Sequence, residues 1–165
     1  MDFTSKVCVV TGGALGIGRC LTQEFARLGA KVAFVDLDAT AGQENLELIR
    51  QAGGEALFFA GDIAEERVLR EFADHVAANY GRVDYLINNA CLSRGGILSQ
   101  CSYEDFNYVL RVGVSAPYFL SLLLLPYFNP GGSIVNIAST RAFQSQPDTE
   151  SYTAAKGGIS ALTHA

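Results

Sequence analysis

Tyr152 and Lys156 stand four residues apart near the end of the sequence. On an α-helix this spacing puts both side chains on one face. A phenol is a poor acid at neutral pH, but an ammonium about 4 Å away, at an effective dielectric constant near 20, stabilises the phenolate by roughly 4 kcal/mol. The pair therefore predicts a site for general acid–base chemistry, although the same pair in isolation is more often an ordinary exposed helix face.

Ser139 follows an apolar run, Ser133–Ile137, that predicts a buried strand. The carboxyl ends of parallel strands are where open α/β sheets bind ligands. A serine hydroxyl at that edge can hold the oxygen atom of a substrate. Ser139, Tyr152 and Lys156 are therefore the predicted catalytic residues.

A glycine-rich segment, Thr11–Gly18, lies between an apolar run, Val7–Val10, and a stretch of helical periodicity. Gly12 suits a tight turn, Gly16 leaves room for a pyrophosphate, and Gly18 lets the helix pack close to the sheet. The free N–H groups and the positive end of that helix favour phosphate. A glycine triplet alone is weak evidence, but between a strand and a helix it predicts a nucleotide-binding loop.

Asp36 comes eighteen residues after Gly18, at the end of a second apolar run. A carboxylate at this place accepts hydrogen bonds from the adenosine ribose, and it repels the 2′-phosphate that distinguishes NADP from NAD. Gly13 and Leu37 occupy the neighbouring positions where basic residues would favour that phosphate. We therefore expect NAD(H) as the cofactor, in preference to NADP(H).

Apolar runs that predict strands alternate with helical patterns along the whole sequence, which indicates parallel strands, right-handed crossovers and helices on both faces of a sheet. The predicted strands are Val7–Val10, Lys31–Asp36, Ala56–Ala60, Val83–Asn88 and Ser133–Ile137. The predicted helices are Gly16–Leu28, Thr40–Gln51, Glu65–Tyr80, about Ser102–Tyr127, and one that begins near Ser151, with a turn at Pro130–Gly132. Residues 1–165 are expected to form one doubly wound, Rossmann-like α/β domain with strand order 3-2-1-4-5.

Composition narrows the classes of function. With 165 residues, of which 49% are hydrophobic and 18% charged, the chain is long enough for one folded core. A net charge of −5 argues against nucleic-acid binding. Because the apolar run 120–125 is far shorter than a membrane span and no signal sequence is recognisable, we expect a cytoplasmic protein without a membrane partner.

The four cysteines have no metal-binding or redox spacing, so we expect them to be buried, reduced thiols. We expect His75 and His164 to be surface residues rather than metal ligands.

Four further segments follow the glycine loop in order: Gly61-Asp62-Ile63, Asn88 to Cys91, Ser139, and Tyr152 to Lys156. With the loop, they resemble the short-chain dehydrogenase/reductase family over all 165 residues. The resemblance implies that Asp62 contacts the adenine amino group, that Lys156 donates to the nicotinamide ribose, and that Ser139, Tyr152 and Lys156 are catalytic. The implied cofactor-binding residues are Gly12, Leu15, Gly16, Ile17, Gly18, Asp36, Asp62, Ile63, Asn89, Ala90, Tyr152 and Lys156.

Two positions depart from the pattern of that family. The family has a fourth catalytic residue, an asparagine in the long helix that holds a proton-relaying water, and Gly113 stands at its position. Cys91 replaces the glycine that ends the family's Asn-Asn-Ala-Gly motif. We expect Gly113 to weaken the proton relay, and we expect Cys91 to be either a tolerated small residue or a thiol near the nicotinamide pocket.

A third departure is length. Members of the family have a sixth and a seventh strand and a lid over the substrate, which this sequence lacks. The fifth strand would then be a sheet edge with an uncovered apolar face. The sequence is therefore expected to be either a piece of a longer protein or a chain that needs a partner to cover that face.

The expected function is an NAD(H)-dependent oxidoreductase that interconverts an alcohol and a carbonyl compound by hydride transfer, with Tyr152 as the general acid and base. The alternative is a catalytically impaired NAD-binding or assembly module, suggested by Gly113 and the missing C-terminal part. A dimer or tetramer is expected, because the segment Ser121–Tyr127 and the helix beginning at Ser151 match the usual subunit interface of the family. The substrate itself is not readable from the sequence.

Overall fold

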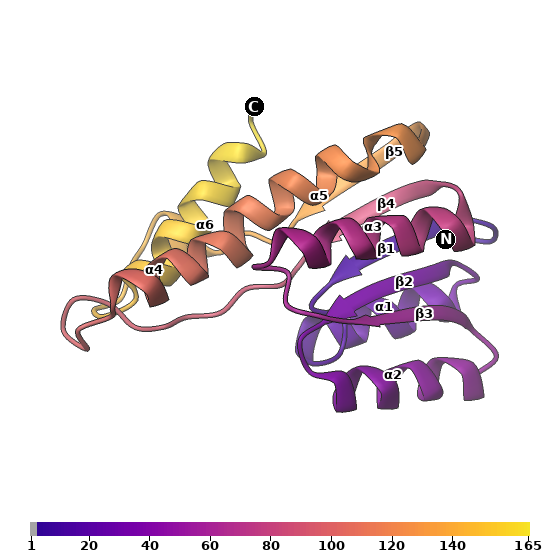
Figure 1. Ribbon diagram of the computed structural model, residues 1–165, viewed down its shortest axis with the longest axis horizontal. Helices are drawn as coiled ribbons and strands as arrows, with labels where there is room; N and C mark the ends of the chain where they lie inside the picture. Colours follow the sequence, from indigo (N-terminus) through magenta and orange to yellow (C-terminus); the bar gives the residue numbers. More distant parts are fainter. Residues whose placement is uncertain (1–2) are drawn as a thin grey trace.

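Five parallel strands form one sheet in the order β3-β2-β1-β4-β5, as Figure 1 shows for the computed structural model, which describes residues 3–165. The strands are β1 Val7–Thr11, β2 Lys31–Asp36, β3 Glu55–Ala60, β4 Val83–Asn88 and β5 Phe128–Asn136. This confirms the predicted Rossmann-like class and strand order. The order reverses between β1 and β4, and such a reversal opens a crevice at the carboxyl ends of the strands.

Helices cover both faces of the sheet (Figure 1). α1 Gly16–Arg27 and α2 Ala39–Gln51 pack on one face, and α3 Glu66–Tyr80 and α5 Ala116–Leu124 pack on the other. The side chains of β1 alternate between the two cores because successive residues of a strand point to opposite faces. Val10 lies in the core with α1 and α2, whereas Val9 lies in the core with α3 and α5.

The long helix expected over residues 102–127 is continuous but not uniform. It consists of α4 Tyr103–Leu110, a π-helical turn η1 Arg111–Ser115, α5, and a 3-10 turn η2 Leu125–Tyr127. Pro117 explains the irregular middle, because it has no N–H group to donate to the carbonyl of Gly113, four residues earlier. Periodicity alone did not predict this interruption.

By length and composition, one helix within residues 3–165, Tyr103–Tyr127, could span a membrane. We did not predict this helix as a candidate span, because we considered only uninterrupted apolar runs. In this helix polar residues separate the apolar ones. A core helix passes the same test. Leu120 and Leu124 in this helix are fully buried against the sheet.

β5 begins five residues earlier than predicted. Its register with β4 is irregular, because Phe128 pairs with Val83 whereas Ser133 pairs with Tyr85. The intervening Pro-Gly-Gly segment was predicted as a turn before the strand, but it is a bulge inside the strand, with Gly131 at a φ of +81°. Glycine accepts this left-handed conformation without strain.

β5 is an edge strand, and the structure places apolar side chains on an open face there. Ile134 and Val135 are each 44% exposed, because no sixth or seventh strand within residues 3–165 covers them. This agrees with the uncovered apolar face expected from the sequence. After β5 come a short 3-10 turn, η3 Thr140–Ala142, and the last helix, α6 Glu150–Leu162. α6 packs against α4 and η1, so the end of the chain lies beside the long helix (Figure 1).

Candidate active site

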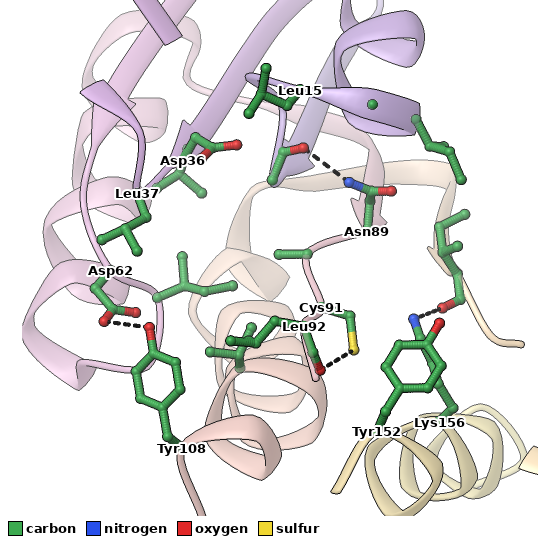
Figure 2. Close-up of a pocket in the computed structure, with 18 of the residues that line it drawn as sticks. Leu15, Asp36, Leu37, Asp62, Asn89, Cys91, Leu92, Tyr108, Tyr152 and Lys156 are labelled. Carbon is green, nitrogen blue, oxygen red and sulfur yellow. Dashed lines mark hydrogen bonds between the residues drawn. The ribbon is translucent and has the colours of Figure 1, made fainter. Parts of the chain in front are cut away.

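A cavity of about 660 Å³ opens where the carboxyl ends of the strands meet the turns that follow them (Figure 2). All three predicted catalytic residues line it, and so do all the predicted cofactor-binding residues except Gly18. These lining residues are Gly12, Leu15, Gly16, Ile17, Asp36, Asp62, Ile63, Asn89, Ala90, Ser139, Tyr152 and Lys156. The fold therefore brings residues from six separate segments to one place.

The glycine loop presents bare backbone to this cavity. Gly12 has a φ of +67° and Gly16 a φ of +54°, both in the left-handed region that favours glycine. A Cβ atom at Gly16 would have no neighbour within 4 Å, so the space in front of it is open. A Cβ atom at Gly18 would lie 1.8 Å from the carbonyl oxygen of Gly12, so Gly18 does not face the cavity but lets α1 pack against the loop.

Asn89 supports the loop from the other side. Its Nδ2 donates to the carbonyl oxygens of Thr11 and Gly12, both at 3.0 Å. The N–H groups of Asn89 and Ala90 both donate to Thr11 Oγ1 at 3.1 Å. These bonds join the end of β4 to the end of β1, so Asn89 positions the loop as well as lining the cavity.

Asp36 ends β2 at the rim of the cavity. Its two oxygens accept from the N–H groups of Ala14 at 2.9 Å and Asp38 at 3.0 Å, and each keeps a further acceptor position. A side chain at Gly13 would collide with Phe34, whose Cβ would lie 2.6 Å from the added Cβ. No basic side chain can therefore stand at residue 13 without rearrangement, and the carboxylate sets the charge at this end of the cavity.

Asp62 has a partner that the sequence did not suggest. The hydroxyl of Tyr108, on α4, donates to Asp62 Oδ2 at 2.9 Å (Figure 2). The N–H of Ala64 donates to Asp62 Oδ1, also at 2.9 Å. Burial, and then the bond to Asp62, raise the pKa of Tyr108. The guanidinium of Arg94 lies 4.9 Å from the centre of the Tyr108 ring. Since 46 residues separate Tyr108 from Asp62, only the docking of α4 reveals the pair.

The predicted catalytic residues meet at the ends of β5 and α6. Tyr152 and Lys156 project from α6 on the same side, toward the cavity (Figure 2). Lys156 is 5% exposed, and its Nζ donates to the carbonyl of Ile137 at 2.5 Å and lies 5.6 Å from the centre of the Tyr152 ring. Ser139 caps η3, where its Oγ accepts from the N–H of Arg141 at 3.1 Å.

Cys91 also lines the cavity, and its position there is compatible with both alternatives given for it, a tolerated small residue and a thiol near the nicotinamide pocket. Burial raises the pKa of this thiol, and the Lys156 ammonium opposes that rise.

The expectation that every cysteine is buried is wrong, since Cys8 alone is buried and Cys20 is exposed, although all four are free thiols. His75 is partly buried and packs on the ring of Phe59 at 5.8 Å between centres, so it is not simply a surface residue.

Residues 3–165 hold no group of three or more histidine, cysteine, aspartate or glutamate side chains that could bind a metal ion. Sequence reasoning missed several other apolar lining residues, because the fold and not a motif brings them to the cavity. They are Val35, Leu92, Val112, Ile137 and Ala138, whereas Leu37 and Gly61 had been noted beside Asp36 and Asp62.

Comparisons with known proteins agree with this architecture. The family model for short chain dehydrogenases matches residues 6–165. An uncharacterized oxidoreductase of Thermotoga maritima is 42% identical over 161 residues, which are 96% of this chain and 63% of that protein. The chain therefore spans less than two thirds of the length of that relative.

Two solved structures show the same fold. A short chain dehydrogenase/reductase from Burkholderia phymatum in complex with NAD is 30% identical with a TM-score of 0.93, over 99% of this chain and 59% of that one. A metagenomic short-chain oxidoreductase in complex with NADP is 31% identical with a TM-score of 0.91, over 99% of this chain and 76% of that one. Fold, cavity and family model agree, and the chain belongs to the short-chain dehydrogenase family of oxidoreductases.

Proposed function

We propose that the protein is an NAD(H)-dependent oxidoreductase that interconverts an alcohol and a carbonyl compound, with Tyr152 as the general acid and base. One observation carries this proposal: the buried ammonium of Lys156 lies beside the ring of Tyr152, in a cavity that Ser139 also lines. In a site shielded from water, a nearby cation stabilises a phenolate far more than it does in bulk solvent. This arrangement suits proton transfer to or from a substrate oxygen.

The open backbone at Gly16 supports a dinucleotide in the same cavity. No side chain stands in front of this residue, and the first N–H groups of α1 have no partners within the helix. The carboxylate of Asp36 supports NAD(H) over NADP(H), because a 2′-phosphate would meet like charge there. When bound, the nicotinamide supplies the acceptor or the donor of a hydride.

The three catalytic side chains have separate tasks in this proposal. Ser139 Oγ accepts the N–H of Arg141, so its own hydroxyl proton is free to bond a substrate oxygen. Tyr152 exchanges a proton with that oxygen. Lys156 places its ammonium beside Tyr152, and the hydrogen bond to the carbonyl of Ile137 fixes its position.

A second candidate function is a module that binds NAD(H) and assembles with a partner but does not turn over substrate. Gly113 favours it, because glycine has no side chain to bond a relay water. The apolar edge at Ile134 and Val135 favours it too, because a partner could cover these side chains. This candidate predicts cofactor binding without turnover.

The test is an assay of the native protein with NAD+ or NADH on a panel of alcohols and ketones, followed by nicotinamide absorbance. We expect Tyr152→Phe to lower kcat by about 10²–10⁴-fold, the usual contribution of general acid–base catalysis. Tyr103→Phe is the control, because Tyr103 is 87% exposed and does not line the cavity. Turnover that survives Tyr152→Phe at the parent rate would refute the role of Tyr152, and binding without turnover across the panel would favour the second candidate.

We also propose that the protein is a homo-oligomer. Tyr118, Leu122 and Leu125 on α5 and η2 are 56%, 50% and 62% exposed, and apolar side chains gathered in this way are typical of an interface. Light scattering of the native protein tests the proposal, and a monomeric mass at micromolar concentration would contradict it.

A further inference from the structure

Asn45 is a polar residue at a fully buried position of α2. The buried residues of this helix recur every three or four positions and form the stripe that faces the core. They are Ala41, Gly42, Asn45, Leu46 and Ile49. An amide in such a stripe is costly unless its polar atoms are hydrogen-bonded, so the bonds of Asn45 must compensate for the loss of water.

Both polar atoms of the Asn45 amide have partners outside α2. Nδ2 donates to the carbonyl of Gly13 and to Thr22 Oγ1, both at 2.8 Å. Oδ1 accepts from Gln23 Nε2 at 2.9 Å. Because a carbonyl can only accept, the nitrogen of Asn45 must face Gly13, which fixes the orientation of the amide. The bond joins α2 to a glycine loop residue 32 positions earlier in the sequence.

The peptide group between Gly13 and Ala14 is held from both sides. Its carbonyl accepts from Asn45 Nδ2, and its N–H donates to Asp36 Oδ2 at 2.9 Å. In a trans peptide the carbonyl and the N–H point in opposite directions, so the two bonds together fix the plane of the group. The backbone of Gly13 also lies close to Phe34, where an added Cβ atom would be 2.8 Å from ring Cδ2. The peptide therefore cannot turn without breaking a buried hydrogen bond.

A close approach at Gly42 places α2 where Asn45 can reach the loop. A Cβ atom at Gly42 would lie 2.0 Å from the ring of Phe58, and that ring stacks on Phe34 with 5.0 Å between ring centres. Gly42 and Asn45 are three residues apart and so lie on the same face of the helix. α2 is therefore seated on an aromatic pair that itself contacts the glycine loop.

We propose that Asn45 is a positioning residue for cofactor binding, because it fixes the peptide whose N–H orients the carboxylate of Asp36. This inference rests on the proposed function, since Asp36 is the group proposed to bond the adenosine ribose. Asn45 does not line the cavity and touches no cofactor in this proposal. It acts through one peptide group, so it should change cofactor affinity and not the chemical step.

Leucine at residue 45 has a similar size but removes this donor. The Gly13 carbonyl then keeps Thr22 Oγ1 as a side-chain donor at 3.4 Å, and that hydroxyl has a nearer acceptor in the carbonyl of Arg19 at 2.9 Å. A buried carbonyl without a good partner is unfavourable. The peptide should therefore turn, and its N–H should leave Asp36.

The first test measures the peptide without any cofactor. Hydrogen exchange of the isotope-labelled native protein is followed by NMR, and we expect the Ala14 amide to exchange about tenfold faster in Asn45→Leu than in the parent. The amides of β4 serve as the internal reference, because a general loss of stability would accelerate them as well. Ile49→Val, in the same buried stripe of α2, is the matched control and should leave Ala14 unchanged relative to β4.

The second test measures cofactor affinity. We expect Asn45→Leu to raise the Kd for NADH about tenfold in a fluorescence titration, and to leave kcat at saturating NAD+ within about twofold of the parent. A residue that only stabilised the fold would lower the active fraction and hence kcat, without changing the Kd. Thr22→Val weakens the same site more gently and should raise the Kd about threefold, so it provides the test if Asn45→Leu does not fold.

A double-mutant cycle tests whether Asn45 acts through Asp36. In the Asp36→Ala background, adding Asn45→Leu should change the Kd for NADH by less than about twofold, because the group that the peptide orients is already gone. Additive effects of the two substitutions would overturn the proposed path from Asn45 to the cofactor.

The outcomes separate this inference from the proposed function. If the parent binds NADH and Tyr152→Phe abolishes turnover, but Asn45→Leu keeps the parent Kd and the parent exchange rate at Ala14, this inference fails and the proposed function stands. If the parent does not bind NADH, the proposed function fails, and the role given to Asn45 fails with it.

Discussion

The Lys156 ammonium donates to the main-chain carbonyl of Ile137 at 2.5 Å, so α6 is tied to the end of β5. The N–H of Ile137 in turn donates to the carbonyl of Asn88 at 3.0 Å. Asn88 directly precedes Asn89, which holds the glycine loop. The cation proposed to act in catalysis and the loop proposed to bind phosphate are therefore connected through backbone groups at the ends of two neighbouring strands.

Removing this cation should disable turnover. We expect Lys156→Met to lower kcat by about 10²–10⁴-fold, because the phenolate of Tyr152 loses the charge that stabilises it. Steady-state kinetics at several pH values measure the effect. Lys31→Met is the control, because Lys31 pairs with Glu55 on the surface, away from the cavity. A Lys156→Met variant with the parent kcat would show that the ammonium does not act on the reaction.

Cofactor preference should depend on the rim residue Asp36. We expect the double variant Asp36→Ser/Leu37→Arg to shift the ratio of kcat/KM toward NADP(H) by tenfold or more, about 1.4 kcal/mol, because a negative charge is removed and a positive one is added beside the 2′-phosphate. Leu37 is 65% exposed, so an arginine has room there.

Leu37→Arg alone is the matched control for this shift. The new guanidinium can pair with the remaining Asp36 carboxylate, so we expect it to change the preference much less. Equal shifts in the single and the double variant would mean that Asp36 does not set the preference.

Tyr108→Phe should weaken cofactor binding without slowing the chemical step. Loss of the bond to Asp62 frees that carboxylate to rotate, and a hydrogen bond to a charged group contributes about 1.5 kcal/mol or more, so we expect the Kd for NAD(H) to rise about tenfold. Fluorescence titration measures it. Tyr103→Phe, at an exposed residue on the same helix, should leave the Kd unchanged, and an unchanged Kd in Tyr108→Phe would contradict the positioning of Asp62.

Local patterns were enough to predict the glycine loop and the positions of two strands, and the sheet order followed from the Rossmann-like class that they indicate. Gly12, Gly16 and Gly18 sit between a strand and a helix, so their spacing alone identified the loop, although Asn89 also holds it. The predicted strands β2 and β4 match the structure at both ends, because each is a short, mainly apolar stretch that ends in a polar residue, Asp36 or Asn88.

The features that could not be predicted depend on contacts between distant segments. The bond from Tyr108 to Asp62 exists only once α4 docks over the turn after β3. The early start of β5 depends on a bulge that pairing with β4 stabilises, although a proline and two glycines suggest a turn. The bond from Asn45 to Gly13 likewise needs α2 to pack on α1.

Asp84 lies at the end of the sheet away from the cavity, and it should make the free energy of unfolding depend on pH. Its side chain is 4% exposed. Burial opposes its ionisation, but hydrogen bonds from the N–H of Val7 and from the side chains of Arg82, Lys6 and Asn129 outweigh burial and lower its pKa below the usual 3.8. A carboxyl group whose pKa is lower in the folded than in the unfolded state stabilises the fold above the unfolded pKa and loses that contribution as the pH falls through the folded pKa.

We therefore expect the free energy of unfolding to fall below about pH 4, and Asp84→Asn to lower it by about 1–3 kcal/mol at pH 7 while flattening this part of the pH dependence. Urea denaturation at pH 3 to 7 measures both effects. Asp74→Asn, at an exposed residue of α3, should change neither. Equal pH dependence in Asp84→Asn and in the parent would show that Asp84 does not contribute.

A comparison of variants at Gly16 and Gly53 distinguishes backbone strain from ligand contact. Both residues have a positive φ, +54° and +83°, and a Cβ atom at either would meet no atom within 4 Å. Alanine at each should cost about 1–2 kcal/mol of stability, the strain of the left-handed conformation. Gly16 lines the cavity and Gly53 does not, so Gly16→Ala alone should also weaken NAD(H) binding, by tenfold or more, because its methyl group enters the space proposed for the pyrophosphate. Thermal melts and fluorescence titrations of both variants measure the two effects, and equal affinities would show that the pyrophosphate does not approach Gly16.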